Sequence, residues 1–328
     1  MRLNELGERK IIREISGKQN PWKPDDCYAM ENGDEYTLIS SDIISRESHL
    51  PSMQYPDLIG RFAANINLSD IAAMAGVPEG MTVSYMVDGE MEDSFLRAVH
   101  EGIRSELKKN SAEIFGGDTK EGNGFVIAGT IIGKQKKDLT RFRSQIKPRQ
   151  IIGITNSLGR AASGYIFHQS GYSKERGIRM LLGIQARLHE ASVLSKAGAR
   201  FMMDMSDGLY SSINQMKEDY GVGFKLVQDE ISIDKSTEKA SFISGLSPLE
   251  IAANFGGDYE LLFTVDSNNY KKLSEEAASA GISISFIGET WDGENLLYDG
   301  EEWIKIKGKG WEHFSRNLVF PETKSFNR

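Results

Sequence analysis

Residues 67–74 read Asn-Leu-Ser-Asp-Ile-Ala-Ala-Met and set one carboxylate, Asp70, among apolar and small neighbours. Phe62 and Ile66 precede it at helical spacing, which predicts a helix over residues 57–76 with Asp70 on its buried side. A charge in that position is costly unless it is paired or bound to a cation. The stretch therefore predicts a packed helix that carries an acidic group into a site.

Strand and helix patterns alternate around that helix. A hairpin is predicted from residues 27–30 and 36–40, because the Asn-Gly dipeptide between them is a strong turn signal. Further elements are expected along this half of the chain: strands at 82–87, 113–115 and 125–133, and an amphipathic helix at 92–108. This alternation, with pairs of adjacent strands, is typical of an α/β or α+β domain.

The second half continues the alternation after a change in composition. Residues 134–149 are rich in lysine and arginine, so we place a domain boundary there and expect domains over 1–140 and 141–328. Strands are expected after this boundary at 151–155, 200–205, 223–227, 260–265 and 282–287. The chain is thus expected to fold as two α/β domains.

Composition narrows the function classes. The 328 residues carry a net charge of -8, which gives no general attraction to nucleic acid. No apolar run approaches the length of a membrane span, so a cytoplasmic location and no membrane partner are expected. Cys27 is the single cysteine and there are five histidines, which excludes a cysteine-rich zinc site and favours a hard cation on oxygen ligands.

Further aspartates occur where chain segments turn. They are Asp25, Asp26, Asp42, Asp118, Asp204 and Asp207. A hairpin turn centred on Asn32-Gly33 places Asp25 opposite Ser40, and Ser41 adds a second hydroxyl beside the first three carboxylates. Together with Asp70, this set predicts a phosphate site that uses several cations.

A strand-to-helix switch is predicted at residues 204–209, where Ser206 and Asp207 follow a largely apolar strand. Both residue types are common helix N-caps, and a cap would explain them without a function. A cap does not explain Asp204, which shares a strand face with Ser206. The functional interpretation is a metal and phosphate site at a helix N-terminus, where free N–H groups favour anions.

Residues 116–119, Gly-Gly-Asp-Thr, follow a short predicted strand. A tight turn explains them adequately. Two glycines would also let the backbone approach a phosphate, with Asp118 facing a cation. The chain has no Gly-x-x-x-x-Gly-Lys-Ser/Thr motif, so a P-loop kinase is excluded.

Three other places have a functional and a simpler interpretation. Arg143 lies in the basic connector, where an arginine fork could reach a nucleotide, although such connectors are usually solvated. His49 is either a loop histidine or a ligand contact. The turn before residues 260–265 either carries Asp258 towards substrate or is a tight turn with Glu260 solvated.

In their order along the chain, these motifs and the terminal residues 310–314 resemble the thiamine-monophosphate kinase family, from about Leu6 to Phe314. That family is similar to aminoimidazole ribonucleotide synthetase, selenophosphate synthetase and the hydrogenase maturation protein E, which bind ATP without a P-loop. The resemblance implies a two-domain aminoimidazole ribonucleotide synthetase-like fold. It also implies a homodimer formed through the N-terminal sheets, with ATP and several Mg²⁺ near that interface.

The resemblance also assigns roles to residues. Metal ligands are expected at Asp26, Ser40, Ser41, Asp42, Asp70, Asp118, Asp204 and Asp207, of which Asp42, Asp70, Asp118 and Asp207 are the catalytic carboxylates. Nucleotide contacts are expected at Gly117, Asp118, Arg143 and Ser206, and substrate contacts at His49 and Trp311. The N-terminal domain would bind ATP and Mg²⁺, and the C-terminal domain would complete the nucleotide and substrate site.

The implied reaction is transfer of the ATP γ-phosphoryl group to thiamine monophosphate. An anionic acceptor needs charge neutralisation more than a strong base, which explains the number of carboxylates. Gly257 stands where the family has a substrate-contacting glutamate, so Asp258 is expected to take its place or the acceptor is held differently. The segments around residues 23–24 and 43–50 also depart from the family pattern.

Two alternatives remain open. Another ATP-dependent member such as aminoimidazole ribonucleotide synthetase is one, and a non-catalytic nucleotide or thiamine-phosphate binding protein is the other. Selenophosphate synthetase needs a reactive cysteine in a glycine-rich segment, whereas Cys27 lies in a predicted strand. The hydrogenase maturation protein ends in cysteine, whereas this sequence ends in Arg328.

Overall fold

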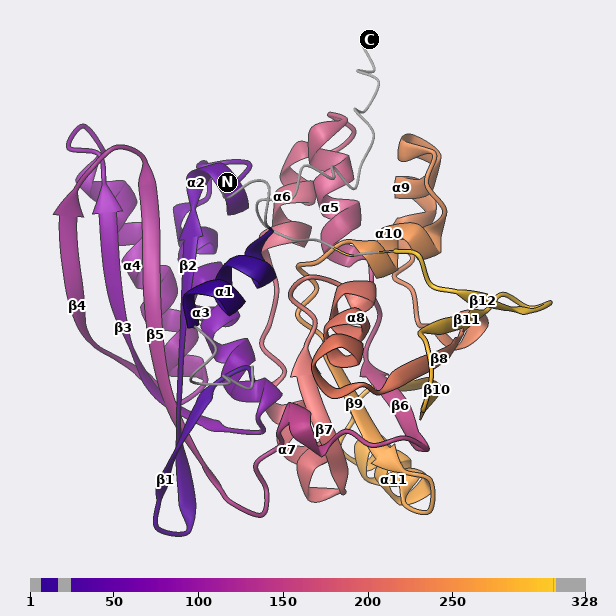
Figure 1. Cartoon of the computed structure of the whole chain (residues 1–328). Helices are drawn as coiled ribbons and strands as arrows, with labels where there is room; N and C mark the ends of the chain where they lie inside the picture. The colour runs from indigo at the N-terminus through magenta and orange to yellow at the C-terminus, as the bar shows by residue number, and fades with distance from the viewer. Residues whose placement is uncertain (1–6, 17–24, 309, 311–328) are drawn as a thin grey trace.

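The computed structural model describes residues 7–16, 25–308 and 310. Two sheets lie side by side, one in each half of the chain (Figure 1). The first sheet has the order β1-β2-β5-β3-β4. Its strands are β1 Tyr28–Asn32, β2 Glu35–Ser45, β3 Val77–Val87, β4 Glu113–Glu121 and β5 Phe125–Lys136.

Helices α3 (Pro56–Ala73) and α4 (Asp93–Lys109) cover one face of this sheet (Figure 1). Residues of β2 alternate between the two faces, so Leu38 and Ile44 are buried under α3 while Ile43 on the other face is 63% exposed. The short helices α1 (Glu8–Ser16) and α2 (Arg46–His49) complete this half. One face of the sheet is therefore packed, and the other presents exposed apolar side chains.

The second sheet has seven strands in the order β12-β11-β8-β10-β6-β9-β7. They are β6 Gln150–Thr155, β7 Ala199–Asp204, β8 Gly223–Val227, β9 Leu261–Asp266, β10 Ile284–Trp291, β11 Leu296–Tyr298 and β12 Trp303–Lys305. The helices of this half are α5 Arg160–Gln169, α6 Lys174–Leu182, α7 Leu188–Lys196, α8 Leu209–Tyr220, α9 Ser236–Ser244, α10 Pro248–Asn254 and α11 Tyr270–Ser279. Short 3-10 turns lie at Arg143–Gln145 and Gln228–Glu230.

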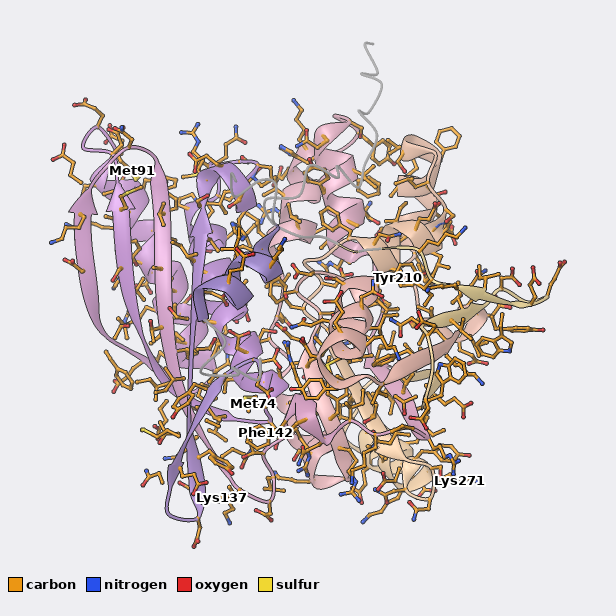
Figure 2. The ribbon with its side chains drawn as sticks, in the orientation of Figure 1. Met74, Met91, Lys137, Phe142, Tyr210 and Lys271 are labelled. Carbon is orange, nitrogen blue, oxygen red and sulfur yellow. The ribbon has the colours of Figure 1, made fainter. Side chains whose placement is uncertain are left out.

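Helix α3 joins the two halves. It packs on the first sheet and also contacts α6, α7 and β7. Asn65 accepts a hydrogen bond from the backbone N–H of Ala186 at 2.9 Å, and Ser69 donates one to Asp204 at 2.6 Å. Met74, just after α3, and Phe142, in the connector, both lie where the halves meet (Figure 2). The helix predicted from residues 67–74 is therefore the structural centre of the molecule.

The predicted fold class, mixed α/β, is confirmed, and the structure corrects two local predictions. The β1-β2 register pairs Tyr28 with Ile39 and Asn32 with Glu35, so Gly33-Asp34 forms the turn and Asp25 extrapolates to a position opposite Asp42, not Ser40. Strand β4 does not end at residue 115 but continues through Gly117 and Asp118 to Glu121. Among the described residues, no helix combines the length and apolarity needed to cross a membrane.

Candidate cation and phosphate site

Three carboxylates converge where the two halves meet. Oxygens of Asp26, Asp70 and Asp204 all lie within 4.8 Å of one another. We call the site around these three carboxylates the acidic centre. They come from the segment before β1, from α3 and from the end of β7, and therefore from both halves of the chain. Such a set of oxygen ligands fits a hard divalent cation such as Mg²⁺.

Asp70 approaches this centre from the last turns of α3. Burial raises its pKa well above the usual range of a carboxyl, and the neighbouring aspartates raise it further. Ser40 of β2 donates its hydroxyl to Asp70 Oδ2 at 2.5 Å, which fixes the rotamer of the carboxylate. The cost of placing a carboxylate here is thus partly offset by one hydrogen bond, and a bound cation would offset much more.

Asp204 is buried at the end of β7, and Ser69 donates to its Oδ2 at 2.6 Å. Burial raises the pKa of Asp204 to about 8, with Asp26 as the next cause. Ser69 was not among the residues predicted for the site. The available signal was its position next to Asp70 in residues 67–74. One residue of a helix can hold a metal ligand from another segment while its neighbour is itself a ligand.

Arg143 forms a two-bond ion pair with Asp26. Its Nε and Nη2 atoms lie 3.1 and 2.6 Å from the two carboxylate oxygens of Asp26. Its backbone N–H also donates to Asp25 at 3.1 Å, while burial raises the pKa of Asp25 to about 7. Arg143 was predicted to contact nucleotide, and in this structure its fork is occupied by Asp26. It orients the first aspartate pair and supplies one positive charge to the acidic centre.

The neighbours of Ser40 on β2 divide between the two faces of the sheet. Asp42 shares the face of Ser40, and burial raises its pKa, although a hydrogen bond to Asp70 opposes that effect. Ser41 faces the other way and donates its hydroxyl to the Gly129 carbonyl at 2.8 Å. The strand alternation thus brings Asp42 into the acidic centre and directs the Ser41 side chain away from it.

The strand-to-helix switch after β7 is built differently from a simple cap. Gly208, with φ of 89°, is the N-cap of α8, so neither Ser206 nor Asp207 holds that position. The cap interpretation of Ser206 and Asp207 is therefore wrong. A Cβ at Gly256 would lie 2.0 Å from the Ser206 carbonyl oxygen, and the Gly257 N–H donates to that oxygen at 2.7 Å. Glycine is required at this turn because residues 256 and 257 pack directly on the backbone of Ser206.

Tyr259 follows this turn and was missed by the sequence analysis. Its φ of 52° is in the left-handed region, which is strained for an aromatic residue. Its ring packs edge-on against Phe62 of α3, with centroids 6.3 Å apart. Burial raises the Tyr259 pKa well above its usual range, and the carboxylates of the acidic centre add to this. The phenol is thus held as a neutral O–H donor beside that centre.

Asp258 and Glu260 are occupied by internal contacts. Asp258 accepts the backbone N–H groups of Gly159 and Ala161 at 2.6 and 2.8 Å, and so stabilises the start of α5. Glu260 is buried and forms a two-bond ion pair with Arg187 at 2.8 and 2.6 Å, so the solvated interpretation of Glu260 is wrong. Each oxygen of Asp258 binds one N–H at the start of α5, and a substrate contact at Asp258 stays a prediction.

Asp118 is not brought to the acidic centre within this chain. It lies in edge strand β4, its side chain is 60% exposed, and it pairs with Lys120 at 3.3 Å. Strands β5 and β3 separate β4 from Asp42 on β2, a distance of about 14 Å at the usual strand spacing. A Cβ at Gly117 would lie 1.7 Å from the Val83 carbonyl oxygen, so strand packing alone requires that glycine.

The two remaining substrate candidates lie elsewhere. His49 ends α2, and its Nδ1 lies 2.6 Å from the Ser48 hydroxyl. It follows β2 by four residues, which places it beyond the far end of the strand that carries Asp42. Trp311 lies outside the described residues.

Comparisons with known proteins match both halves of the chain. Residues 24–135 match the family model described as AIR synthase related protein, N-terminal domain, and residues 151–297 match its C-terminal domain. The thiamine-monophosphate kinase of Pyrococcus horikoshii is 27% identical over 95% of this chain and 97% of that protein. The thiamine-monophosphate kinase of Bacillus subtilis is 29% identical over 79% and 82%.

Solved structures show the same fold. The structure of AaThiL complexed with AMPPCP and TMP has a TM-score of 0.83 and 23% identity, and covers 95% of this chain and 99% of that one. Escherichia coli HypE, a hydrogenase maturation protein, has a TM-score of 0.71 at 15% identity, over 88% and 93%. The two matched domains account for most of the sequence, and the chain therefore belongs to the AIR synthase related protein family.

Proposed function

We propose that the chain is an ATP- and Mg²⁺-dependent kinase that transfers the γ-phosphoryl group of ATP to thiamine monophosphate, giving thiamine diphosphate and ADP. The thiamine-monophosphate kinases that match nearly the whole chain support this proposal. The observation that carries it is the convergence of Asp26, Asp70 and Asp204 within 4.8 Å. A site with so many carboxylates can receive polyphosphate only through cations.

The residues fit Mg²⁺ by their chemistry. The donor set consists of carboxylates held by hydroxyl and guanidinium partners. Burial raises the pKa of Asp70 and Asp204, and a bound cation would counteract this by favouring the ionised carboxylates. Asp26, Asp42, Asp70 and Asp204 would hold the ions, with Asp207 adjoining. When bound, Mg²⁺ neutralises phosphate charge and orients the transferred group.

The chain's own residues keep that centre in place. Ser40, Ser69 and Arg143 each fix one carboxylate, so three ligands are oriented before any nucleotide arrives. Tyr259 supplies a neutral donor next to them, which can hydrogen-bond a phosphoryl oxygen without adding charge. The acceptor is itself a phosphate, so the site does not require a general base.

The acceptor's organic part would lie along β2 towards His49. Gly257 leaves out the glutamate side chain of the family, and its Cβ position is 3.2 Å from Ala161. A side chain at this position would be crowded against Ala161, which favours an acceptor held by His49 and Trp311 rather than by a carboxylate at the Gly-Gly turn. Replacement of His49 by alanine should raise the KM for thiamine monophosphate more than it lowers kcat.

A homodimer through the uncovered face of the first sheet is part of the same proposal. Ile43 is 63% exposed on that face. Asp118 pairs in register with Ser84, whose side chain also lies on the side of β3 opposite buried Val83 and Tyr85. Pairing two such faces would bury the apolar side chains and bring Asp118 to an interface, where a role in metal or nucleotide binding becomes feasible. We also place the protein in the cytoplasm.

The deciding experiment is coupled ADP release with thiamine monophosphate, with thiamine and with no acceptor. The proposal expects Mg²⁺-dependent ADP and thiamine diphosphate only with thiamine monophosphate. ADP formation with formylglycinamidine ribonucleotide instead would favour the aminoimidazole ribonucleotide synthetase alternative. Nucleotide binding without ADP in any mixture would favour a non-catalytic binding protein.

A further inference from the structure

A cavity of about 600 Å³ lies among helices α5, α6 and α9, apart from the acidic centre. Its wall includes Arg160, the first residue of α5, and Ser236, the first residue of α9. Volumes of roughly 300–1,000 Å³ are usual for sites that bind small organic molecules. A single phosphate ion would leave most of this space unfilled.

Four cationic side chains line the cavity: Arg160, Arg176, Arg179 and Lys235. They come from α5, from α6 and from the N-cap of α9, within a chain whose net charge is -8. All four side chains are exposed, so water screens their mutual repulsion, and their shared sign still favours an anion over a cation in this space. The cavity therefore has the electrostatic character of an anion site.

The two carboxylates in the wall are already engaged. Glu175 accepts from Arg179 Nε and Nη2 at 3.1 and 3.0 Å. Asp234 accepts the backbone N–H of Ser236 at 2.8 Å as well as its hydroxyl. Across the described part of the chain, Arg160, Arg176 and Lys235 form no ion pair, and the four cations of the wall outnumber its two carboxylates.

Aromatic contacts help to hold two of the guanidinium groups. Arg176 lies over the Phe167 ring at 5.7 Å, and Arg179 lies over Tyr55 at 5.3 Å. Such contacts leave the N–H edge of an arginine available for the oxygens of a phosphate. The ends of α5 and α9 are not available, since Asp258 and Asp234 already take their N–H groups. The side chains, not the helix ends, would bind the anion.

The α6 side of the cavity lies far from Asp70. Arg179 packs on Tyr55, which immediately precedes α3, whereas Asp70 lies near the other end of that helix. Fifteen residues of α-helix span about 22 Å. On the other side, Arg160 follows Gly159, whose N–H binds Asp258 next to the Gly-Gly turn, so the α5 side of the cavity lies nearer to the acidic centre.

We propose that this cavity is a second ligand site, which binds a small organic phosphate carrying at least two negative charges. The positive charge of its wall disfavours a ligand whose organic part is positively charged. The guanidinium forks of its arginines match the geometry of phosphate oxygens. The site is independent of the kinase proposal, because none of its four cations belongs to the acidic centre. It also needs no divalent metal.

The test uses inorganic pyrophosphate as the probe, measured by calorimetry in EDTA. Without divalent cations the acidic centre repels the probe, so binding reports the cavity. The double variant Arg160→Glu/Arg176→Glu should weaken pyrophosphate binding at least tenfold, and the milder Arg160→Gln/Arg176→Gln should weaken it less. Asp204→Asn should bind the probe as the unaltered protein does.

The matched control is Lys271→Glu, an exposed charge reversal on α11, far from the cavity (Figure 2). It should leave pyrophosphate affinity unchanged, and sodium chloride at equal ionic strength should not displace the probe. No pyrophosphate binding in EDTA, or equal affinity in the Gln double variant, the control and the unaltered protein, would overturn the site. A failure of the kinase assay would not affect this result.

Discussion

Asp70 and Asp118 come from motifs of similar appearance, but the fold gives them opposite surroundings. Asp70 lies where two halves of the chain meet, with Asp26 and Asp204 within 4.8 Å and a hydroxyl holding it. Asp118 lies on an exposed edge strand and pairs with Lys120. Only the first carboxylate carries an electrostatic cost that a cation would relieve. The comparison shows that the surroundings of a carboxylate depend on its neighbours in the fold, not on its motif.

The largest effect is expected from Asp70→Asn. Loss of one ligand charge from the centre should lower Mg²⁺-dependent ADP formation by roughly 10²-fold or more. The variant should melt in EDTA no lower than the unaltered protein, because the substitution also removes carboxylate repulsion. Steady-state kinetics and thermal melts measure the two effects, and normal turnover would contradict the metal role.

Tyr259→Phe should come next. The phenol hydroxyl adjoins the carboxylates while the ring packs on Phe62, so its removal should lower kcat about tenfold with little change in the KM for ATP. Tyr36→Phe, in the first sheet away from the acidic centre, is a control of the same chemistry. A change confined to melting temperature would show that Tyr259 is structural only.

Ser69→Ala should have a smaller effect, through Asp204. Loss of the 2.6 Å hydrogen bond frees the carboxylate to rotate, and supporting residues of this kind usually change metal affinity by about 10-fold or more. Titration with Mn²⁺ as a spectroscopic probe measures this directly. Ser105→Ala, in α4, controls for the loss of a helix serine hydroxyl. Equal Mn²⁺ affinity in both variants would remove Ser69 from the site.

The pH dependence of stability should report the buried carboxylates Asp25 and Asp204 without any substrate. Asp25 and Asp204 have pKa values raised from 3.8 to about 7 and about 8, so the folded state holds their protons more tightly than the unfolded state. In EDTA, the contribution of these two groups to the free energy of unfolding is therefore greatest below pH 4. That contribution is lost as the pH rises towards 8. Mg²⁺ should raise the melting temperature more at pH 8 than at pH 6. A Mg²⁺ effect independent of pH would argue against ion binding at Asp204.

The smallest effect is expected from Asp118→Asn in the isolated chain. The side chain is exposed and its pKa is lowered chiefly by the Thr119 N–H, so melting and Mn²⁺ affinity of a monomer should not change. If the proposed dimer brings Asp118 to an interface, ADP formation should fall while the mass by light scattering stays dimeric. No loss of activity in the dimer would restrict the site to the residues between the two halves.

The sequence was sufficient for much of the fold and for the family of the chain. Periodic apolar residues predicted α3, and the family resemblance carried by the ordered motifs is confirmed by the matches to both domains. The division into domains 1–140 and 141–328 and the individual ligand roles stay predictions. Local patterns are informative for these features because helix periodicity and residue chemistry act over a few neighbouring positions.

Other features depended on contacts between distant segments. The hairpin register was wrong because the Asn-Gly signal does not decide which two residues form the turn. Strand β4 continued through Gly-Gly because pairing with β3 outweighs the local turn preference of those residues. Ser69 and Tyr259 were missed because their roles depend on Asp204 and on Phe62, which are remote in sequence.

The sequence alone therefore determined which ligand types are available, an aspartate-rich set suited to hard cations, since residue type fixes that chemistry. The tertiary structure decided which aspartates share a site. It placed Asp26, Asp70 and Asp204 together and kept Asp118 apart, because α3 packs between the sheets while β4 lies at an edge. It also assembled the basic cavity from three helices, a juxtaposition that no local pattern contains. Proximity across the chain is set by packing, and the cost of gathering like charges indicates where a ligand of opposite charge belongs.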